Sequence, residues 1–390
     1  MLYVPTMFSR LGASLTRVTS SGRMIGEIDG LRFIAIATVI LHHVLFIMRD
    51  QPHLNEGILG SSLVEFFDLG NVGVKLFFGI SGFILALPFA EAALAGGRRV
   101  ELKRYYLRRL TRLEPPYVIN LVALVALALL SHGAERAGRI PHLFASLTYS
   151  HNFIYGYWSE INFVAWSLEI EAQFYVMAPI LALVFRIPSK TIRRLVLILG
   201  MLGCATIAVY YSNASYAIRM LLPFHLHFFL VGFVLADLYA KGQWKHVTQP
   251  MPGAELLATL GIGIVFLLWA RASTKELAFV GVFLFYFGVF RSRIWRGLLN
   301  IKALVVYGGM CYTIYLYHFW IMRPFVQATG PRLCAALPHG VGFLLLGLLT
   351  LVVVGIVSIV PFVLFEKPFM YHKWPQWFGQ RVARAWRTAR

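Results

Sequence analysis

The chain alternates between long apolar runs and short polar segments. Ten of the runs have roughly the length that a helix needs to cross the hydrocarbon core of a bilayer. They cover residues 30–49, 72–93, 115–131, 164–185, 195–211, 218–240, 255–271, 277–290, 303–323 and 341–365. The pattern therefore predicts an all-α polytopic membrane protein, built as a bundle of about ten transmembrane helices.

The basic residues of the polar segments predict the orientation of these helices. With the N-terminus inside, the inner segments hold 26 lysines and arginines and the outer segments hold 8, while Arg32 and Lys75 lie within apolar runs. Cytoplasmic loops of membrane proteins carry an excess of these residues. We therefore expect an N-in/C-in, multi-pass protein of the cell (inner) membrane.

Three segments are predicted along the chain. Residues 1–27 have no apolar core or small-residue cleavage site, so we expect a cytoplasmic leader and not a signal peptide. Residues 28–370 form the transmembrane domain. In residues 371–390, tryptophans alternate with arginines, which predicts a basic amphipathic helix on the anionic lipids of the inner leaflet.

Composition and charge narrow the class of protein. The 390 residues are 58% hydrophobic and only 14% charged, which excludes an ordinary soluble protein. The net charge of +19 could indicate a nucleic-acid partner, but the basic residues are spread over loops between apolar runs, so none is expected. The three cysteines show no C-x-x-C pairing, and neither a disulfide framework nor a zinc site is indicated.

The first apolar run carries ionisable residues. Arg32 and His43 are eleven residues apart, which places both on one face of a helix and ~16 Å apart along its axis. Such groups are costly inside a membrane and indicate a function by default. One interpretation is a polar path through the membrane. The other is a snorkelling arginine and a histidine that hydrogen-bonds a neighbouring helix.

Two further runs carry polar groups. Glu169 and Glu171 begin the fourth run, where two carboxylates within one helical turn are better explained by function than by packing. In the second run, Ser81 lies between Gly79 and Gly82, a pattern that favours close helix packing over ligand contact.

A dense basic segment precedes the third run. Arg104, Arg108 and Arg112 repeat every four residues and would form one ridge of a helix, with Arg109 beside it. Guanidinium groups at the inner surface suit bidentate binding of phosphates. Binding of lipid headgroups is the alternative.

Depth relates several of these groups to one another. His43, Glu171, His225 and His318 all lie five to seven residues from the outer end of their runs, or ~8 to 11 Å. We therefore expect them to line one polar chamber that opens outward. His225 and His227 point to nearly opposite sides of a helix, so no metal site is proposed.

Six motifs in order resemble the membrane acyltransferase family 3, which includes bacterial O-acetyltransferases of O-antigen and exopolysaccharide. The resemblance covers about residues 29 to 369. The motifs are Asp29-Gly-Leu-Arg32 to His43, Phe77-Phe-x-x-Ser-Gly-Phe83, Arg108-Arg-x-x-Arg112-Leu-x-Pro115-x-Tyr117, Trp166-Ser-Leu-x-x-Glu171-x-Gln-Phe-Tyr175, Tyr312-x-x-Tyr-Leu-x-His318 and Glu366-Lys-Pro-Phe369.

The resemblance implies an integral membrane O-acyltransferase. It would transfer an acyl group, usually acetyl, from acyl-CoA as cosubstrate to a hydroxyl of a carbohydrate, glycolipid or glycoside acceptor, with no permanently bound cofactor. The family's catalytic arginine and histidine fall on Arg32 and His43, and its acid on Glu171. Its basic motif falls on Arg108, Arg109 and Arg112. A second acid common in the family is replaced here by Ala172.

The predicted mechanism assigns roles to these residues. Arg104, Arg108, Arg109 and Arg112 would hold the phosphates of acyl-CoA, and His43 would be the general base on the acceptor hydroxyl. A covalent acyl-histidine is an alternative. Glu171 would orient His43 or bind the acceptor. The remaining candidates for acceptor binding or oxyanion stabilisation are Ser81, Trp166, Tyr315 and His318.

Two other function classes are weighed. A proton-coupled transporter of an anionic or sugar-like solute would also use intramembrane histidine, glutamate and arginine. The sequence shows no repeated halves, which argues against a transporter. A non-catalytic scaffold would not need ionisable groups at a common depth.

Overall fold

The computed structural model describes residues 25–50, 62–132, 139–240 and 249–371, together with Leu15, Arg17 and Trp374. Within these ranges the secondary structure is entirely helical. The predicted leader at 1–27 and the predicted tail at 371–390 lie almost wholly outside the described residues.

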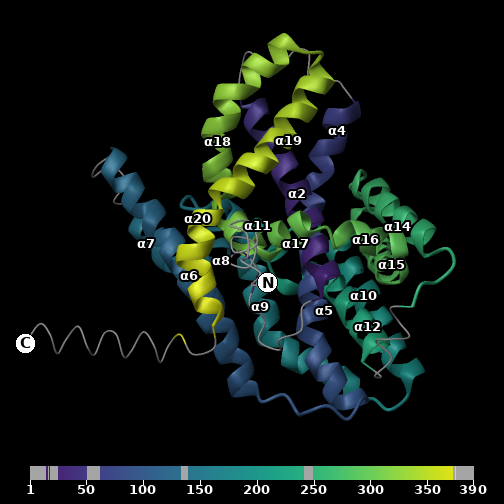
Figure 1. Ribbon diagram of the computed structural model, residues 1–390. Helices are drawn as coiled ribbons and strands as arrows, with labels where there is room; N and C mark the ends of the chain where they lie inside the picture. The colour runs from purple at the N-terminus through teal and green to yellow at the C-terminus, as the bar shows by residue number, and fades with distance from the viewer. Residues whose placement is uncertain are drawn as a thin grey trace, which may run out of the picture.

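Each of the ten apolar runs falls on a principal helix (Figure 1). These helices are α2 (Gly26–Arg49), α5 (Gly73–Leu94), α6 (Leu102–His132), α9 (Trp166–Leu181), α10 (Lys190–Tyr210), α12 (Leu226–Tyr239), α14 (Ala254–Trp269), α15 (Ala278–Arg291), α18 (Cys311–Ala336) and α19 (His339–Val357).

Short helices connect them. They are α4 (Ser62–Asp68), η1 (Leu69–Val72), α7 (Arg139–Leu147), α8 (His151–Tyr155), η3 (Phe163–Ala165), η4 (Ala182–Arg186), α11 (Tyr216–Arg219), η5 (Leu222–Phe224), η6 (Lys275–Leu277), α16 (Arg293–Leu299), α17 (Lys302–Gly309), α20 (Ile359–Pro361), η7 (Phe362–Glu366) and η8 (Lys367–Met370). Of these, η7 is a π-helical turn.

Six of the described helical segments are long and apolar enough to cross a membrane. They are Gly26–Arg49, Glu65–Leu94, Leu102–Leu130, Phe163–Arg186, Lys190–Tyr210 and Gly340–Met370. A seventh candidate is α15 with α16, bent by 91°. The helices α12 and α14, with 14 and 16 residues, are shorter than the ~20 residues that a simple span needs. The structure supports a polytopic membrane protein, and the count of ten spans and the N-in/C-in topology stay predictions.

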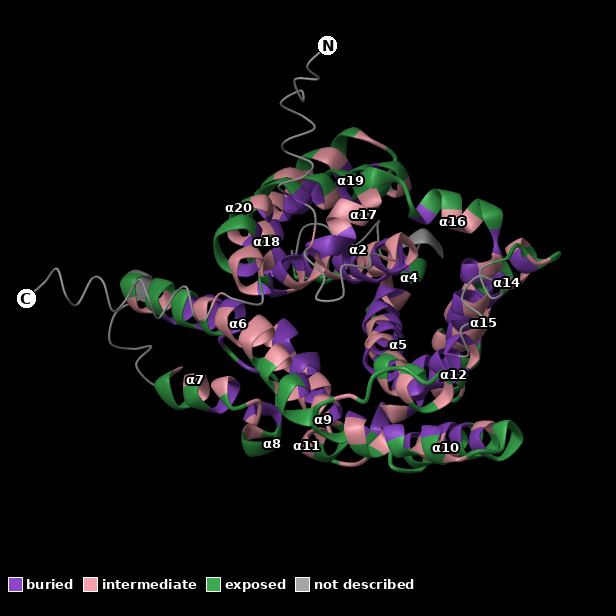
Figure 2. Cartoon of the chain, turned by 60° about the horizontal axis from the view of Figure 1, so that its bottom comes forward, coloured by how far each residue is buried: buried purple, intermediate pink, exposed green. Residues whose placement is uncertain are grey.

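Exposed apolar side chains support the same conclusion. In Figure 2, α10 lies at the margin of the molecule and α2 is surrounded by other helices. The outer face of α10 exposes Ile192, Leu195, Leu199 and Leu202, although soluble proteins rarely expose large apolar patches. This face is suited to contact with lipid.

Glycines allow α5 and α12 to pack with their backbones in contact. A Cβ atom at Gly82 would lie 2.0 Å from the carbonyl oxygen of Phe229, and a Cβ at Gly232 would lie 2.0 Å from the amide nitrogen of Phe83. Gly79 similarly faces the ring of Tyr286. The interpretation of Gly79 and Gly82 as packing residues is confirmed.

The contact between α2 and the start of α5 fixes how the two helices are offset. A Cβ at Gly70 would lie 2.2 Å from the carbonyl oxygen of Thr38, and a Cβ at Gly73 would lie 2.3 Å from that of Ala35. The first turn of α5 therefore abuts the middle of α2 and not its end. From there, the two helices run in opposite directions.

Candidate functional site

His43 of α2 and His318 of α18 form a hydrogen-bonded pair. His43 Nδ1 lies 2.9 Å from His318 Nε2, and the His318 side chain is fully buried while His43 is partly exposed. The sequence predicted that both lie in one chamber, and the structure brings these two together.

The surroundings of His318 fix the protonation of the pair. His318 Nδ1 lies 2.9 Å from the carbonyl oxygen of Tyr315 and 3.1 Å from that of Ile314, so this nitrogen donates its hydrogen to the backbone. In the neutral ring, Nε2 must then accept, and the hydrogen comes from His43 Nδ1. His43 Nε2 is left with a lone pair, as a general base requires.

Aromatic rings surround His43. Its ring centroid lies 5.6 Å from that of Phe163, 5.8 Å from Phe319 and 6.4 Å from Phe46, each in an edge-on arrangement. These walls limit the rotation of the imidazole and lower the local dielectric constant. A hydrogen bond in such a place is stronger than in water.

Tyr315 lies one turn before His318 and is held by the segment that enters α9. Its hydroxyl donates to the carbonyl oxygen of Val164 and accepts from Ser167 Oγ at 3.0 Å. The phenol therefore anchors η3 and the start of α9 against α18. Its hydrogen is already engaged, so in this arrangement it does not supply a free oxyanion donor.

Glu171 belongs to a different cluster. Its carboxylate accepts from Ser81 Oγ at 2.5 Å and from the Tyr175 hydroxyl at 2.9 Å. The guanidinium of Arg109 lies 5.9 Å from the centre of the Tyr175 ring. Of the two roles expected for Glu171, a contact that orients His43 is not among its hydrogen bonds, and Ser81, a candidate oxyanion donor, is bound to Glu171.

The offset of α5 against α2 explains this difference. Ser81 lies eight residues beyond Gly73, or ~12 Å along α5, whereas His43 lies eight residues beyond Ala35 in the opposite direction, again ~12 Å. The single outward chamber was wrong because depths counted from the end of each apolar run assume that all helices start level.

His225, the remaining member of the expected chamber, pairs with Lys75. Lys75 Nζ donates to His225 Nδ1 at 2.8 Å, and the Trp166 ring covers the amine. The sequence assigns Lys75 no role, because a lone lysine in an apolar run gives no signal of its partner. Glu169, in contrast, accepts the backbone N–H of Asn152 at 2.9 Å and positions α8.

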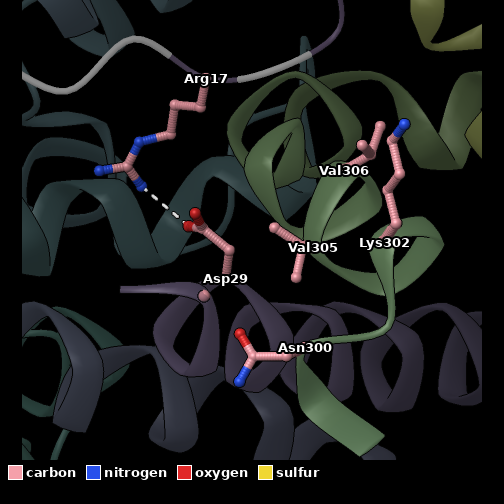
Figure 3. Close-up of a pocket in the computed structure, with 7 residues that line it drawn as sticks. Arg17, Asp29, Asn300, Lys302, Val305 and Val306 are labelled. Carbon is pink, nitrogen blue, oxygen red and sulfur yellow. Dashed lines mark hydrogen bonds and ion pairs between the residues drawn. The ribbon is translucent and has the colours of Figure 1, made fainter. Parts of the chain in front are cut away.

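Arg32 lies at the other end of α2 from His43. It donates to Asp29 Oδ1 at 2.5 Å, and Arg17 donates to the same oxygen at 3.1 Å. Figure 3 shows Arg17 and Asp29 on one side of a cavity of about 340 Å³, with Lys302 rising from α17 on the other and Asn300 below. Two cations and an amide thus border this space.

The predicted arginine ridge lies on α6. Arg104 is exposed, whereas Arg108, Arg109 and Arg112 are partly buried. Arg112 interacts electrostatically with Asp29 and with Glu366. The ridge is therefore continuous with the Arg17–Asp29–Arg32 cluster.

Glu366 belongs to the last of the six motifs. The π-helical turn η7 ends at this residue, and its carboxylate is buried. It accepts the backbone N–H of Thr313 at 3.0 Å and the hydroxyl of the same residue at 2.5 Å. Glu366 therefore ties the C-terminal helix to the start of α18, one turn and a half before His318.

A second histidine pair lies outside the candidate membrane spans. His142 Nδ1 of α7 is 2.8 Å from His151 Nε2 of α8, and His151 Nδ1 donates to the carbonyl oxygen of Tyr157 at 3.2 Å. Burial, and then the neighbouring His142, lower the pKa of His151. Among the residues that the structure describes, no three metal-ligating side chains come together here or elsewhere.

Comparison with known proteins identifies relatives. A family model described as an acyltransferase domain matches residues 25–378. The chain is 24% identical over 348 residues to the peptidoglycan O-acetyltransferase OatA of Listeria monocytogenes, covering 81% of this chain and 53% of that protein. It is 21% identical over 328 residues to the O-acetyltransferase OatA of Staphylococcus aureus, covering 77% and 51%.

A shorter match reaches higher identity. Over 179 residues the chain is 31% identical to a protein of Staphylococcus aureus (strain COL) whose name proposes an O-acetyltransferase, covering 43% of this chain and 26% of that protein. The chain spans about half the length, or less, of these relatives. No solved structure matches.

Proposed function

Because the chain belongs to the acyltransferase family whose domain model matches residues 25–378, we propose that it is an integral membrane O-acyltransferase. It transfers an acetyl group from acetyl-CoA to a hydroxyl of a carbohydrate or glycoside acceptor. The observation that carries the proposal is the His43–His318 pair, which leaves a basic nitrogen on His43.

His43 acts as the general base. Its Nε2 takes the proton of the acceptor hydroxyl while that oxygen attacks the thioester carbonyl. The C–S bond then breaks, and the imidazolium returns the proton to the departing sulfur, so that coenzyme A leaves as the thiol. The imidazolium that forms keeps its hydrogen bond from Nδ1 to His318 Nε2. His318 holds His43 in the productive tautomer, since its own Nδ1 is fixed on the backbone.

The arginine groups bind the acyl donor. Arg104, Arg108, Arg109 and Arg112 provide guanidinium groups for the phosphates of the coenzyme. The cavity beside Asp29 and Arg32 is of the size that accepts part of a cofactor. From Arg32, the pantetheine arm has to extend ~16 Å along α2 to bring the thioester to His43.

The Glu171 cluster lies on the side of Ala35 away from His43, next to the arginine ridge. Glu171 holds Ser81 and Tyr175, and the Tyr175 ring contacts Arg109. We assign Glu171 the task of positioning Tyr175 and Arg109 at the donor end. This role replaces the direct action on His43 that the sequence suggested.

The test measures release of coenzyme A thiol and transfer of labelled acetyl to added glycan by purified protein. His43→Ala is expected to lower transfer on the order of 10²- to 10⁴-fold, the usual contribution of a general base. His42→Ala is the matched control, since His42 lies 3.5 Å from Asp68 and outside the pair.

His318 provides a second arm. A glutamine at this position can still accept a hydrogen bond from His43, whereas leucine cannot. His318→Leu should therefore lower kcat more than His318→Gln. Equal transfer by the wild type and His43→Ala would exclude His43 as the base, and absence of thiol release from every acyl donor tried would favour a transporter.

A further inference from the structure

Lys75 lies at the first turn of α5 inside a cage of aromatic rings. Its Nζ lies 5.2 to 5.9 Å from the centres of four rings. These rings are Phe78, Trp166, Phe228 and Trp269. The lysine is 6% exposed, so the ring faces take the place of water around the ammonium group.

The cage gives Lys75 no anionic partner. Within the described part of the chain, no carboxylate lies within 4.0 Å of its amine. Glu276, the acid that acts on Lys75 from a greater distance, is directed at His227, with 3.2 Å between Oε2 and Nε2. A buried cation that lacks a counter-ion is costly and is normally found paired.

His225 adds a second unsatisfied donor. Since an ammonium group has no acceptor, His225 Nδ1 accepts from Lys75 and its Nε2 carries the hydrogen. That nitrogen is buried and has no partner at normal hydrogen-bonding distance and angle among the described residues, although the backbone carbonyl of Arg219 acts on the ring. The Lys75–His225 pair therefore presents hydrogen-bond donors and has no anionic acceptor of its own.

Two of the four rings around Lys75 are tryptophans that reach the surface. Trp166 and Trp269 are both partly exposed, and Trp269 is held over the cage by a hydrogen bond of 2.5 Å from its Nε1 to Asn71. Indole faces stack on sugar rings as well as on cations. These two indoles are therefore the part of the cage that reaches the surface.

One short segment connects the cage with the aromatic surroundings of His43. Phe163, which packs on His43, and Trp166, which covers Lys75, belong to the consecutive segments η3 and α9. The arginine ridge, in contrast, follows the far end of α5, which has 22 residues and is ~33 Å long. The shared segment η3–α9 associates the lysine cage with the surroundings of His43, and hence with the acceptor.

We infer that Lys75 is the binding site for an anionic group, a carboxylate or a phosphate, of the glycan acceptor, with Trp166 and Trp269 stacking on its sugar rings. The inference rests on the proposed function, and it assigns the enzyme an acidic acceptor. Glu276 is engaged by His227, which leaves the lysine free for an anion of the acceptor.

The experiment compares three ligands with purified full-length protein in nanodiscs. They are a disaccharide ending in glucuronate, its neutral glucose counterpart, and a polyprenyl-phosphate glycolipid. Tryptophan fluorescence reports binding, and KM and kcat for acetyl transfer are measured in the same samples. Preference for the glucuronate identifies a sugar acid as the anion, and preference for the glycolipid identifies the lipid phosphate.

Lys75→Gln removes the charge. We expect it to weaken binding of the preferred anionic ligand about tenfold, with the loss in KM, and to leave binding of the neutral disaccharide unchanged. Lys275→Gln is the matched control because this partly exposed lysine is 4.0 Å from Glu276 and outside the cage. It should keep the anion preference.

Two results would overturn the inference. One is equal binding of anionic and neutral ligands by the wild type, and the other is an unchanged anion preference in Lys75→Gln. If that variant does not fold, Lys75→Met carries the same expectation, since an apolar chain of similar length suits the cage. Failure of the wild type to release thiol from acetyl-CoA would instead contradict the proposed function.

Discussion

At the scale of single residues, this molecule places charges in two different ways. Asp237 of α12 is fully buried and accepts from Arg193, also buried, and from Arg194 at 2.7 Å. Asp68 of α4 is partly exposed and accepts from Arg49 at 3.0 Å. The two carboxylates therefore allow a buried carboxylate–arginine ion pair to be compared with one that is in contact with solvent.

We predict that Asp237→Asn destabilises the protein by about 3–5 kcal/mol, because it leaves buried Arg193 without its counter-charge. Asp68→Asn should cost no more than ~1 kcal/mol, as ion pairs in contact with solvent contribute little. Thermal unfolding of both variants in the same detergent provides the measurement. Similar losses for the two would contradict the assignment of Asp237 to the core.

Single residues also show where sequence reasoning stopped. The spacing of Arg32 and His43 predicted that both lie on one helix, and both are found in α2. The partners of these residues were not local: His43 meets His318 across 275 positions, and Lys75 meets His225 across 150. No periodicity within one helix encodes such contacts, because they depend on how helices are offset and rotated against each other.

At the scale of elements, glycine determines how closely the central helices approach. Gly82 of α5 faces the backbone of Phe229, while Gly203 of α10 has no atom within 4 Å of the place where its Cβ would lie. Both are helical glycines, so a change to alanine brings the same gain in helix propensity at each.

Gly82→Ala is therefore expected to destabilise the protein by about 1–3 kcal/mol through overpacking, and Gly203→Ala to raise stability by up to ~1 kcal/mol. Differential scanning fluorimetry of the two variants distinguishes the effects. The close approach of α5 and α12 would be refuted if Gly82→Ala unfolded at the wild-type temperature or above it.

The elements themselves followed well from the apolar pattern, since each predicted run lies on a helix. The apolar pattern did not reveal where each helix begins and ends along the membrane normal. The run 218–240 is divided among α11, η5 and α12, because Pro223 removes a backbone donor and interrupts the helix. Depths counted along such a run are therefore misleading.

At the scale of the whole molecule, the distribution of basic residues makes a prediction about orientation. Residues 98–112 should face the cytoplasm and residues 139–163 the outside, as the excess of lysine and arginine in the first segment indicates. The structure supports several membrane spans without fixing their direction.

Cysteine labelling in intact cells tests this topology. We expect Glu160→Cys to react with a membrane-impermeant maleimide added outside, and Glu101→Cys to react only after the membrane is permeabilised. Both positions are exposed in the structure. The unsubstituted protein, which has three cysteines of its own, serves as the control for background labelling. Labelling of Glu101→Cys in intact cells would reverse the proposed sides for acyl donor and acceptor.

The π-helical turn η7 sets the direction in which the residues after it point. Such a turn is equivalent to one extra residue in an α-helix, and each added residue rotates the rest of the helix by about 100°. The extra residue turns Glu366 toward Thr313 at the base of α18. Deleting one residue between 359 and 365 would remove the extra residue of this turn, rotate Glu366 away from Thr313 and so separate the C-terminal segment from the helix that carries His318.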